Sequence, residues 1–188
     1  MPFLVTDSAG ALPAETLPAL KLTERCGQPA RGHIYAYLRC YVRGGAFHYD
    51  VTVFDGAAPA TQRAGLALSA DDGAERYLWA EFGAKGGESL AVCRAGGAGP
   101  DRPEQTLALP AVRRTAGGDE QGLYWGVQGV IPADAFLAAF GRAPRAGMIL
   151  PGNVFLYDTR EAAFLSAFPA AGRVPTAQGF EPFVIVPY

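Results

Sequence analysis

HIYAYLRCYVR, residues 33–43, decides the fold class, because apolar and polar side chains alternate along its length. Ile34, Leu38 and Val42 belong to one set, whereas the tyrosines and arginines belong to the other. A repeat of two residues is the pattern of a β-strand whose two faces meet different surroundings. The stretch therefore predicts a strand that turns Ile34, Leu38 and Val42 towards a core and leaves Arg39 and Arg43 outside it.

More alternating runs surround this strand. AFHYDVTVFD, residues 46–55, follows across Gly44-Gly45, and two such runs around a glycine pair are typical of a β-hairpin. Turn residues such as Asp72-Gly73 and Gly86-Gly87 separate the runs that follow. Further strands are predicted at 63–69, 75–84, 89–94, 105–112, 123–131, 149–158 and 182–187.

One short helix is predicted near 132–140 (PADAFLAAF). Pro132 suits the first helical turn and Gly141 suits the position after the last. Phe136, Leu137 and Phe140 are spaced as one apolar stripe, which is expected to dock on the strands. Many strands and one helix predict an all-β fold, an antiparallel, jelly-roll-like β-sandwich. We interpret residues 1–188 as a single domain in which 1–25 form an extended lead-in.

Composition excludes several classes of protein. The chain has 188 residues, of which 49% are hydrophobic and 18% charged, as in globular domains. A net charge of −2 without a basic stripe argues against binding of nucleic acid. No apolar run is long enough to cross a membrane. The beginning, MPFLVTDSAG, lacks the basic and apolar regions of a signal peptide, so we expect a cytoplasmic protein.

Sequence motifs for metals, cofactors and catalysis are absent. Cys26, Cys40 and Cys93 are far apart and are expected to be buried free thiols, so no metal and no cofactor is predicted. There is no phosphate-binding loop and no GxSxG nucleophile motif. The chain is therefore predicted not to be an enzyme.

Two sets of polar residues are candidates for a catalytic site. His33 and His48 lie on neighbouring predicted strands, and Asp50 shares a face with His48, but no nucleophile is linked to them. Ordinary strand-surface residues are the favoured interpretation. Glu81, Asp50 and Asp158 are nominal carboxylates for glycan hydrolysis, with nothing in the sequence that selects them.

Aromatic residues supply the candidates for ligand binding. Trp79 could stack on a sugar ring, although its place in an alternating strand is equally typical of a core residue. Trp125 is favoured as core. The surface best suited to a sugar is the stripe of Tyr35, Tyr37 and Tyr41 with Arg39 and Arg43, since Tyr and Arg combine stacking with hydrogen bonding. Tyr35, Tyr37 and Arg39 are its candidate ligand-binding residues. The favoured alternative for that surface is a sheet face with cross-strand aromatic packing.

The stretch LPGNVFLY, residues 150–157, adds two candidates. Asn153 is the only Asn of the chain and could contact a ligand, although Pro-Gly-Asn also suits a turn, which is the favoured interpretation. Tyr157 completes the candidate ligand-binding set.

The order of elements in the C-terminal two-thirds is distinctive. LYWGVQGVIP at 123–132 runs into the helix, LPGNVFLY follows at 150–157, and FEPFVI at 180–185 ends the pattern. This order resembles the family 9 carbohydrate-binding modules and their bacterial relatives, in which a Trp-bearing strand runs through Ile-Pro into a helix before a G-N-F-Y motif. The resemblance spans roughly residues 30–188 and implies a β-sandwich that binds carbohydrate.

Departures from the family pattern fall on its ligand-binding motifs. The family's Lys falls near Leu156, the Trp of its Ser-Trp pair at Ala167, its H-R-P-E motif at 175–178, and its acidic-Ser pair around Gly65-Leu66. Trp125, Ile131-Pro132 and Gly152-Asn153 remain as scaffold. This pattern is expected of a relative that kept the fold and changed or lost its ligand.

These observations predict a non-catalytic, carbohydrate-binding-like module with weak or altered affinity for a mono- or oligosaccharide. The alternative is a protein-interaction or structural domain that kept the fold and lost the sugar site. The sequence does not indicate an oligomeric state.

Overall fold

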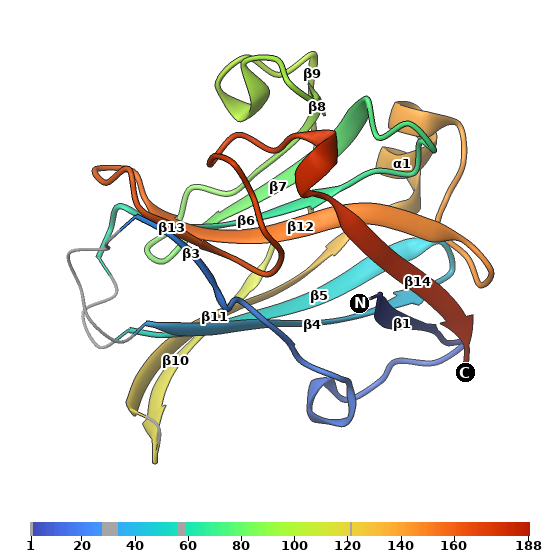
Figure 1. Ribbon diagram of the computed structural model, residues 1–188. Helices are drawn as coiled ribbons and strands as arrows, with labels where there is room; N and C mark the ends of the chain where they lie inside the picture. The colour runs from blue at the N-terminus through green and yellow to red at the C-terminus, as the bar shows by residue number, and fades with distance from the viewer. Residues whose placement is uncertain (1, 28–33, 56–58, 121) are drawn as a thin grey trace.

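The computed structural model describes residues 2–27, 34–55, 59–120 and 122–188. Within them, fourteen strands follow one another in a single sheet that folds over into two layers (Figure 1). The β-sandwich predicted from the alternating runs is confirmed. His33 lies outside the described residues.

Each layer is built from neighbouring antiparallel strands. The first layer contains, in spatial order, β10 (Arg113–Asp119), β11 (Gly122–Ile131), β5 (Ala46–Phe54) and β4 (Tyr35–Arg43), with β2 (Leu20–Lys21) paired to β4. The second layer contains β12 (Ile149–Asp158), β6 (Gln62–Leu68), β7 (Arg76–Gly83), β8 (Ser89–Arg94) and β9 (Gln105–Leu107). At the far edge of the second layer, β13 (Phe164–Ser166) pairs with β12 and with β3 (Glu24–Cys26).

The layers are joined by β1 (Phe3–Asp7) and β14 (Glu181–Pro187), which run side by side (Figure 1). β1 is parallel to both of its neighbours, β14 and β4, so the sheet is mixed rather than wholly antiparallel. The segment 1–25, interpreted from the sequence as an extended lead-in, thus contributes strands to the sheet. In β1, Phe3 and Val5 are buried and Leu4 between them is exposed. The strand is too short for this alternation to be recognised in the sequence.

The main core lies between the layers. Leu38 and Val42 are fully buried there, and Ile34 is partly buried against the same core. Arg39 is half-buried and Arg43 is exposed, as the alternation predicted. Trp125 is also a core residue, as expected.

A buried polar chain connects the two layers within this core. The Trp125 indole N–H donates to Gln62 Oε1 at 2.6 Å, and Gln62 donates to Asp55 Oδ2 at 2.7 Å. Both donors of the chain therefore have partners, as buried polar groups require.

The predicted helix is present as α1 (Ala133–Phe140), and Gly141 ends it in the left-handed conformation. Its predicted stripe was wrong in part. Phe136 is buried together with Ala135 and Ala139, but Leu137 is 48% exposed and Phe140 is only half-buried. The helix docks through the face that carries two alanines, whose small side chains allow a close approach that apolar spacing alone does not reveal.

One edge strand was missed. The missed strand is β10, which includes the residues around Gly117-Gly118 that were expected to form a turn. The strand predicted at 105–112 is present but shorter, as β9. A Cβ on Gly117 would lie 2.9 Å from the Tyr124 hydroxyl, so glycine lets that ring cross the strand. The glycines that suggested a turn therefore serve close packing in a strand.

The cysteines are free, with Cys40 and Cys93 buried and Cys26 partly exposed, close to expectation. No helix in the described segments is both long and apolar enough to span a bilayer.

Candidate functional site: a polar cleft around Glu81

The outer face of the second layer carries a second apolar cluster. On β7, Leu78 and Ala80 face the main core, whereas Tyr77 and Trp79 face the other side. Other members of this second cluster are Ala67, Ala91, Cys93, Phe155, Tyr157 and Phe164. Because both faces of β7 are covered, its residues are buried almost without interruption.

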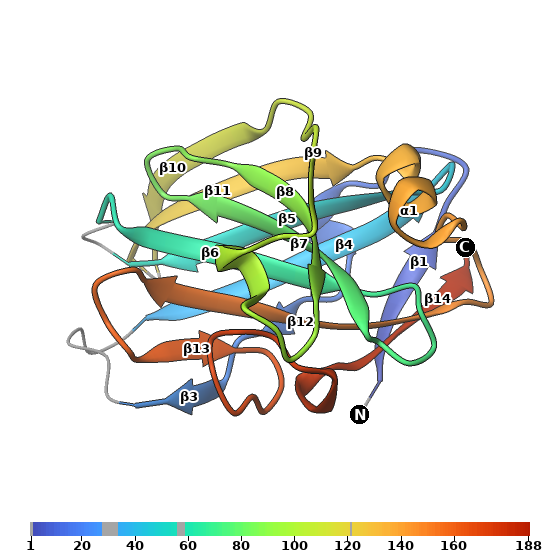
Figure 2. The ribbon, with the colours of Figure 1, turned by 90° about the horizontal axis from the view of Figure 1, so that it is seen from above.

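A cleft of about 420 Å³ opens beside this cluster, within the usual size range of small-molecule sites. Seen from above in Figure 2, the connection between β8 and β9 lies over the second layer, and it contributes Pro100, Asp101 and Pro103 to the cleft. The other lining residues are Trp79, Glu81, Ser89, Ala91, Thr106, Tyr157, Thr159, Arg173 and Val174. We call it the Glu81 cleft.

The Glu81 carboxylate is the centre of the polar contacts. Its Oε2 accepts hydrogen bonds from the Tyr157 hydroxyl and, at 3.4 Å, from the Trp79 indole N–H. Its Oε1 lies 3.7 Å from Arg63 Nε. About a quarter of the Glu81 side chain remains exposed (24%), so the carboxylate is oriented by its neighbours and still reachable by a ligand.

Tyr157 remains a hydrogen-bond donor at neutral pH. Burial, followed by the negative charge of Glu81, raises the pKa of its hydroxyl well above the ordinary value. The Arg173 guanidinium lies over its ring, 5.1 Å from the centroid, a cation–π distance. Tyr157 thus links the Glu81 carboxylate to the positive side of the cleft.

Trp79 lines this cleft but does not offer an open stacking surface. Only 2% of the residue is exposed, and a Cβ on Gly65 would lie 2.0 Å from its ring. The indole therefore lies directly over the glycine of β6, at the place where the resemblance put an acidic-Ser pair. Of the two interpretations that the sequence left open for Trp79, sugar stacking and core packing, the structure shows core packing.

Asn153 is a structural residue. It is fully buried in β12, so neither the turn nor a ligand contact is supported. Its amide donates to the carbonyls of Phe168 (3.1 Å) and Gly179 (2.8 Å), and its oxygen accepts from the N–H groups of Val154 (2.7 Å) and Phe168 (3.1 Å). Two donors and two lone pairs are the whole capacity of an amide side chain, so nothing is left for a ligand.

Tyr35, Tyr37 and Arg39 lie on the opposite side of the molecule, on the outer face of β4. The two tyrosine rings pack with Phe54, with centroids 5.8–6.4 Å apart, and Arg39 lies 4.6 Å above the Tyr37 ring. This is the cross-strand aromatic packing that the sequence favoured. Of the six predicted ligand residues, only Trp79 and Tyr157 come together in one cleft.

Sequence patterns point only weakly to the residues that make this cleft polar. Glu81 was only a nominal carboxylate, although it follows Trp79 by two positions and therefore shares its face. Asp101 and Arg173 lie outside the strands, where no periodicity indicates a direction. Asp50 belongs to the other outer face and Asp158 to a different pocket, so the three nominal carboxylates share no site.

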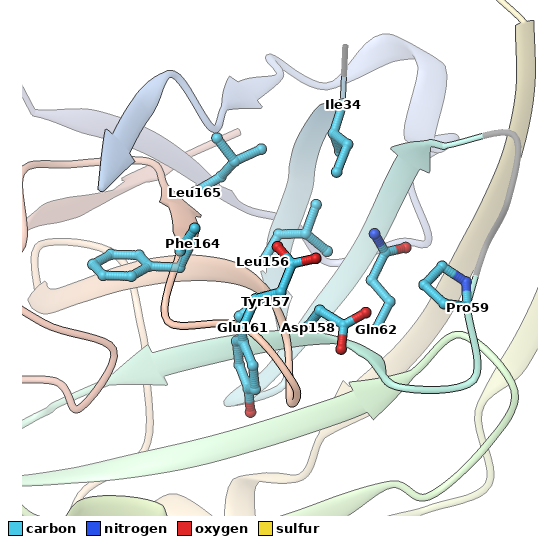
Figure 3. Close-up of a pocket in the computed structure, with 10 residues that line it drawn as sticks. Ile34, Pro59, Gln62, Leu156, Tyr157, Asp158, Glu161, Phe164 and Leu165 are labelled. Atoms are coloured by element: carbon cyan, nitrogen blue, oxygen red, sulfur yellow. The ribbon is translucent and has the colours of Figure 1, made fainter. Parts of the chain in front are cut away.

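That other pocket is too small for a sugar. Figure 3 shows it between Leu156, Gln62 and Ile34, and its volume of about 30 Å³ is roughly that of one water molecule in the liquid. The Tyr157 ring points away from Leu156, to the opposite side of β12 (Figure 3). Tyr157 thus directs its hydroxyl to Glu81 rather than into this pocket.

Solved structures place this architecture among known proteins. A protein from Bacteroides uniformis to which carbohydrate binding is attributed superimposes with a TM-score of 0.71, at 16% identity, over 98% of each chain. A family 9 carbohydrate-binding module from Caldicellulosiruptor kristjanssonii, in complex with cellotriose, matches with a TM-score of 0.67 at 8% identity, over 100% of this chain and 95% of that one. The chain has the fold of the family 9 carbohydrate-binding modules.

A glucose complex of a Caldicellulosiruptor kristjanssonii family 9 module agrees, with a TM-score of 0.65 at 9% identity over 100% of this chain and 97% of that one. No protein-family model matches the chain, and no curated protein matches it. At such low identity the family 9 fold is shown and the ligand is not, because unrelated sites occur on one fold.

Two positions that depart from the family 9 motifs lie in the main core. Leu156 and Ala167, near which the family's Lys and Trp fall, are buried in the main core. They are therefore packing residues here.

Proposed function

We propose that this protein is a non-catalytic carbohydrate-binding protein that holds a mono- or oligosaccharide in the Glu81 cleft. The observation that carries the proposal is the Glu81 carboxylate, held by Tyr157 and Trp79 in a cleft of about 420 Å³ on a family 9 fold. The ligands named for the two Caldicellulosiruptor structures, cellotriose and glucose, suggest which sugars to test first.

The lining of the cleft suits a sugar in two ways. Glu81, Asp101 and Arg173 can form charge-assisted hydrogen bonds with hydroxyl groups, which are stronger than bonds between neutral groups. Pro100 and Val174 offer apolar contact for the C–H groups of a pyranose. The cleft lacks an open aromatic face, since the rings of Trp79 and Tyr157 are covered, so we expect binding to be weak.

The affinity can be bounded from these contacts. Each net hydrogen bond contributes about 0.5–1.5 kcal/mol. A few such bonds supply about 4 kcal/mol, which corresponds to a dissociation constant of about 1 mM. Millimolar affinity is the expected result.

The test is a titration with glucose, cellobiose, cellotriose and xylobiose, followed by calorimetry and tryptophan fluorescence. Glu81→Gln should weaken binding about tenfold, because it removes the central charge-assisted acceptor. Glu75→Gln is the matched control, since Glu75 is exposed just before β7 and loses the same charge. Absence of saturable binding, or equal binding by both variants, would reject the Glu81 cleft as a sugar site.

One surface feature favours the alternative, a protein-interaction domain. Leu4 and Ile149 are 53% and 55% exposed, and both pair with Val184 of β14, so they form a short apolar row across three strands. Apolar rows of this kind occur at protein interfaces. If no sugar binds, loss of a protein partner on substitution of Leu4 and Ile149 by Ser is the result that this alternative predicts.

A further inference from the structure

The outer face of the first layer has a cleft of its own, of about 320 Å³, on the opposite side of the sandwich from Glu81. Its floor is a row of four polar residues in strand register. Arg113 pairs with Gln128, Gln128 with Asp50, and Asp50 with Arg39. Because paired residues point to the same side and neighbouring strands are about 4.8 Å apart, the row spans roughly 14 Å.

The row is positive at both ends. Asp50, near its middle, is occupied by neutral donors: Gln128 donates to its Oδ2 at 2.7 Å and Thr52 to its Oδ1 at 3.4 Å. Within the described residues, neither Arg39 nor Arg113 forms an ion pair with a carboxylate. Two guanidinium groups thus line one cleft, with Asp50 between them, and neither is in an ion pair with a carboxylate of the described residues.

Arg39 is positioned but not satisfied. Its guanidinium lies 4.6 Å from the centre of the Tyr37 ring and donates from Nη1 to the Tyr37 hydroxyl at 3.3 Å. Its Nε is buried and has no hydrogen-bond partner among the described residues. Arg39 lines the cleft, and its guanidinium donates to the Tyr37 hydroxyl alone among the described residues, so it keeps hydrogen-bond donors for a ligand.

The walls of the cleft are suited to an organic ligand. Tyr41 and His48 stack, with ring centroids 4.5 Å apart and planes 12° from parallel, and both line the cleft. Leu12 and Leu17, from the segment between β1 and β2, form an apolar rim. An anion with a carbon skeleton and hydroxyl groups would match the guanidiniums, the amide of Gln128 and this rim together.

We infer that this cleft is a second binding site, for a sugar acid whose carboxylate pairs with Arg39 or Arg113. A planar guanidinium binds a planar carboxylate through two parallel hydrogen bonds, which a neutral sugar cannot supply. Gln128 and Asp50 then face the hydroxyl groups of the ligand. The inference does not depend on sugar binding in the Glu81 cleft.

The experiment compares glucuronate, glucose and glucose 6-phosphate by calorimetry at low and high salt. Glucuronate should bind at least about tenfold more tightly than glucose, and salt should weaken it, because the contact is ionic. Tighter binding of glucose 6-phosphate than of glucuronate would overturn the assignment to a carboxylate. No saturable binding of glucuronate at low salt would overturn the site.

Variants locate the binding. Arg39→Gln and Arg113→Gln should each lower the affinity for glucuronate about tenfold, and Arg113 is exposed, so its variant tests the site even if Arg39→Gln folds poorly. Arg145→Gln, which removes an exposed arginine outside the cleft, should leave the affinity unchanged. Equal affinities for Arg113→Gln and Arg145→Gln would overturn the inference. Glu81→Gln should also bind glucuronate normally, which separates this site from the Glu81 cleft.

Discussion

The two outer faces of the sandwich are built from similar alternating strands, but they differ in how far the rest of the chain covers them. On the second layer, Trp79 and Tyr157 are 2% and 7% exposed, because other segments of the chain pack over them. On the first layer, Tyr35, Tyr37 and Arg39 remain half-buried. Alternation along a strand therefore predicts which residues share a face. Whether the aromatic residues of that face are buried or accessible depends on the segments that pack across it.

Truncation of one aromatic residue on each outer face should give the largest difference in the free energy of unfolding between the two faces. Trp79→Ala should lower the free energy of unfolding by about 3–5 kcal/mol, because it empties a buried site. Tyr37→Ala, on the half-buried face, should cost clearly less. Urea unfolding followed by circular dichroism measures both, and equal losses would show that the two faces are alike in packing.

Asn153 tests how the covering segments are held on the second layer, because its amide donates hydrogen bonds to the carbonyls of Phe168 and Gly179. Asn153→Ala leaves several buried backbone groups without partners, so a loss of about 3 kcal/mol is expected. Hydrogen exchange should rise first around Phe168 and Gly179. Unchanged exchange there would mean that these segments are held by packing alone.

Gly65 tests the close approach beneath Trp79. Gly65→Ala should destabilise the protein by about 1–3 kcal/mol, because the added methyl group collides with the indole. Gly10→Ala is the control, since a Cβ there meets nothing within 4 Å. A neutral Gly65→Ala would show that the indole can shift at little cost.

His48 reports on the first layer, and its effect should be the smallest. Burial, and then the positive charge of Arg43, lower the pKa of His48 below its ordinary value of 6.5. Tyr41 stacks on the ring, and Asp50 lies two residues along the strand. The unfolded chain therefore takes up a proton more readily than the folded protein.

The sign of the pH dependence follows from that difference. The contribution of His48 to stability is complete above pH 6.5 and is lost as the pH falls from there through the lowered pKa of the folded state. His48→Gln should flatten the stability curve in this window. An NMR titration that places the pKa of His48 above 6.5 would contradict this reading.

Much of the fold could be predicted, because strands such as β4 and β5 repeat their pattern over many residues. β1 and β10 were missed for opposite reasons. β1 is too short to show a repeat, and β10 carries glycines that imitate a turn. The helix was located by Pro132 and Gly141, but its buried face depends on the surface on which it docks.

The candidate sites divide in the same way. Trp79 and Tyr157, which the sequence marked as candidates because aromatic side chains can stack on a ligand, line one cleft. Asp101 and Arg173 line it too and were not predicted, because residues outside the strands have no periodic direction. Asn153 was misjudged because its four hydrogen bonds reach segments that are remote along the chain.

By itself, the sequence determined the β class, the place of the helix and the resemblance to the family 9 modules, because local alternation and terminal residues are properties of neighbours along the chain. Only the tertiary structure decided that Trp79 lies buried over Gly65, that Glu81 meets Tyr157 across the sheet, and that Arg39 and Arg113 share a row. These arrangements depend on which strands pair and on how other segments pack over them, and the alternation within one strand does not identify its partners.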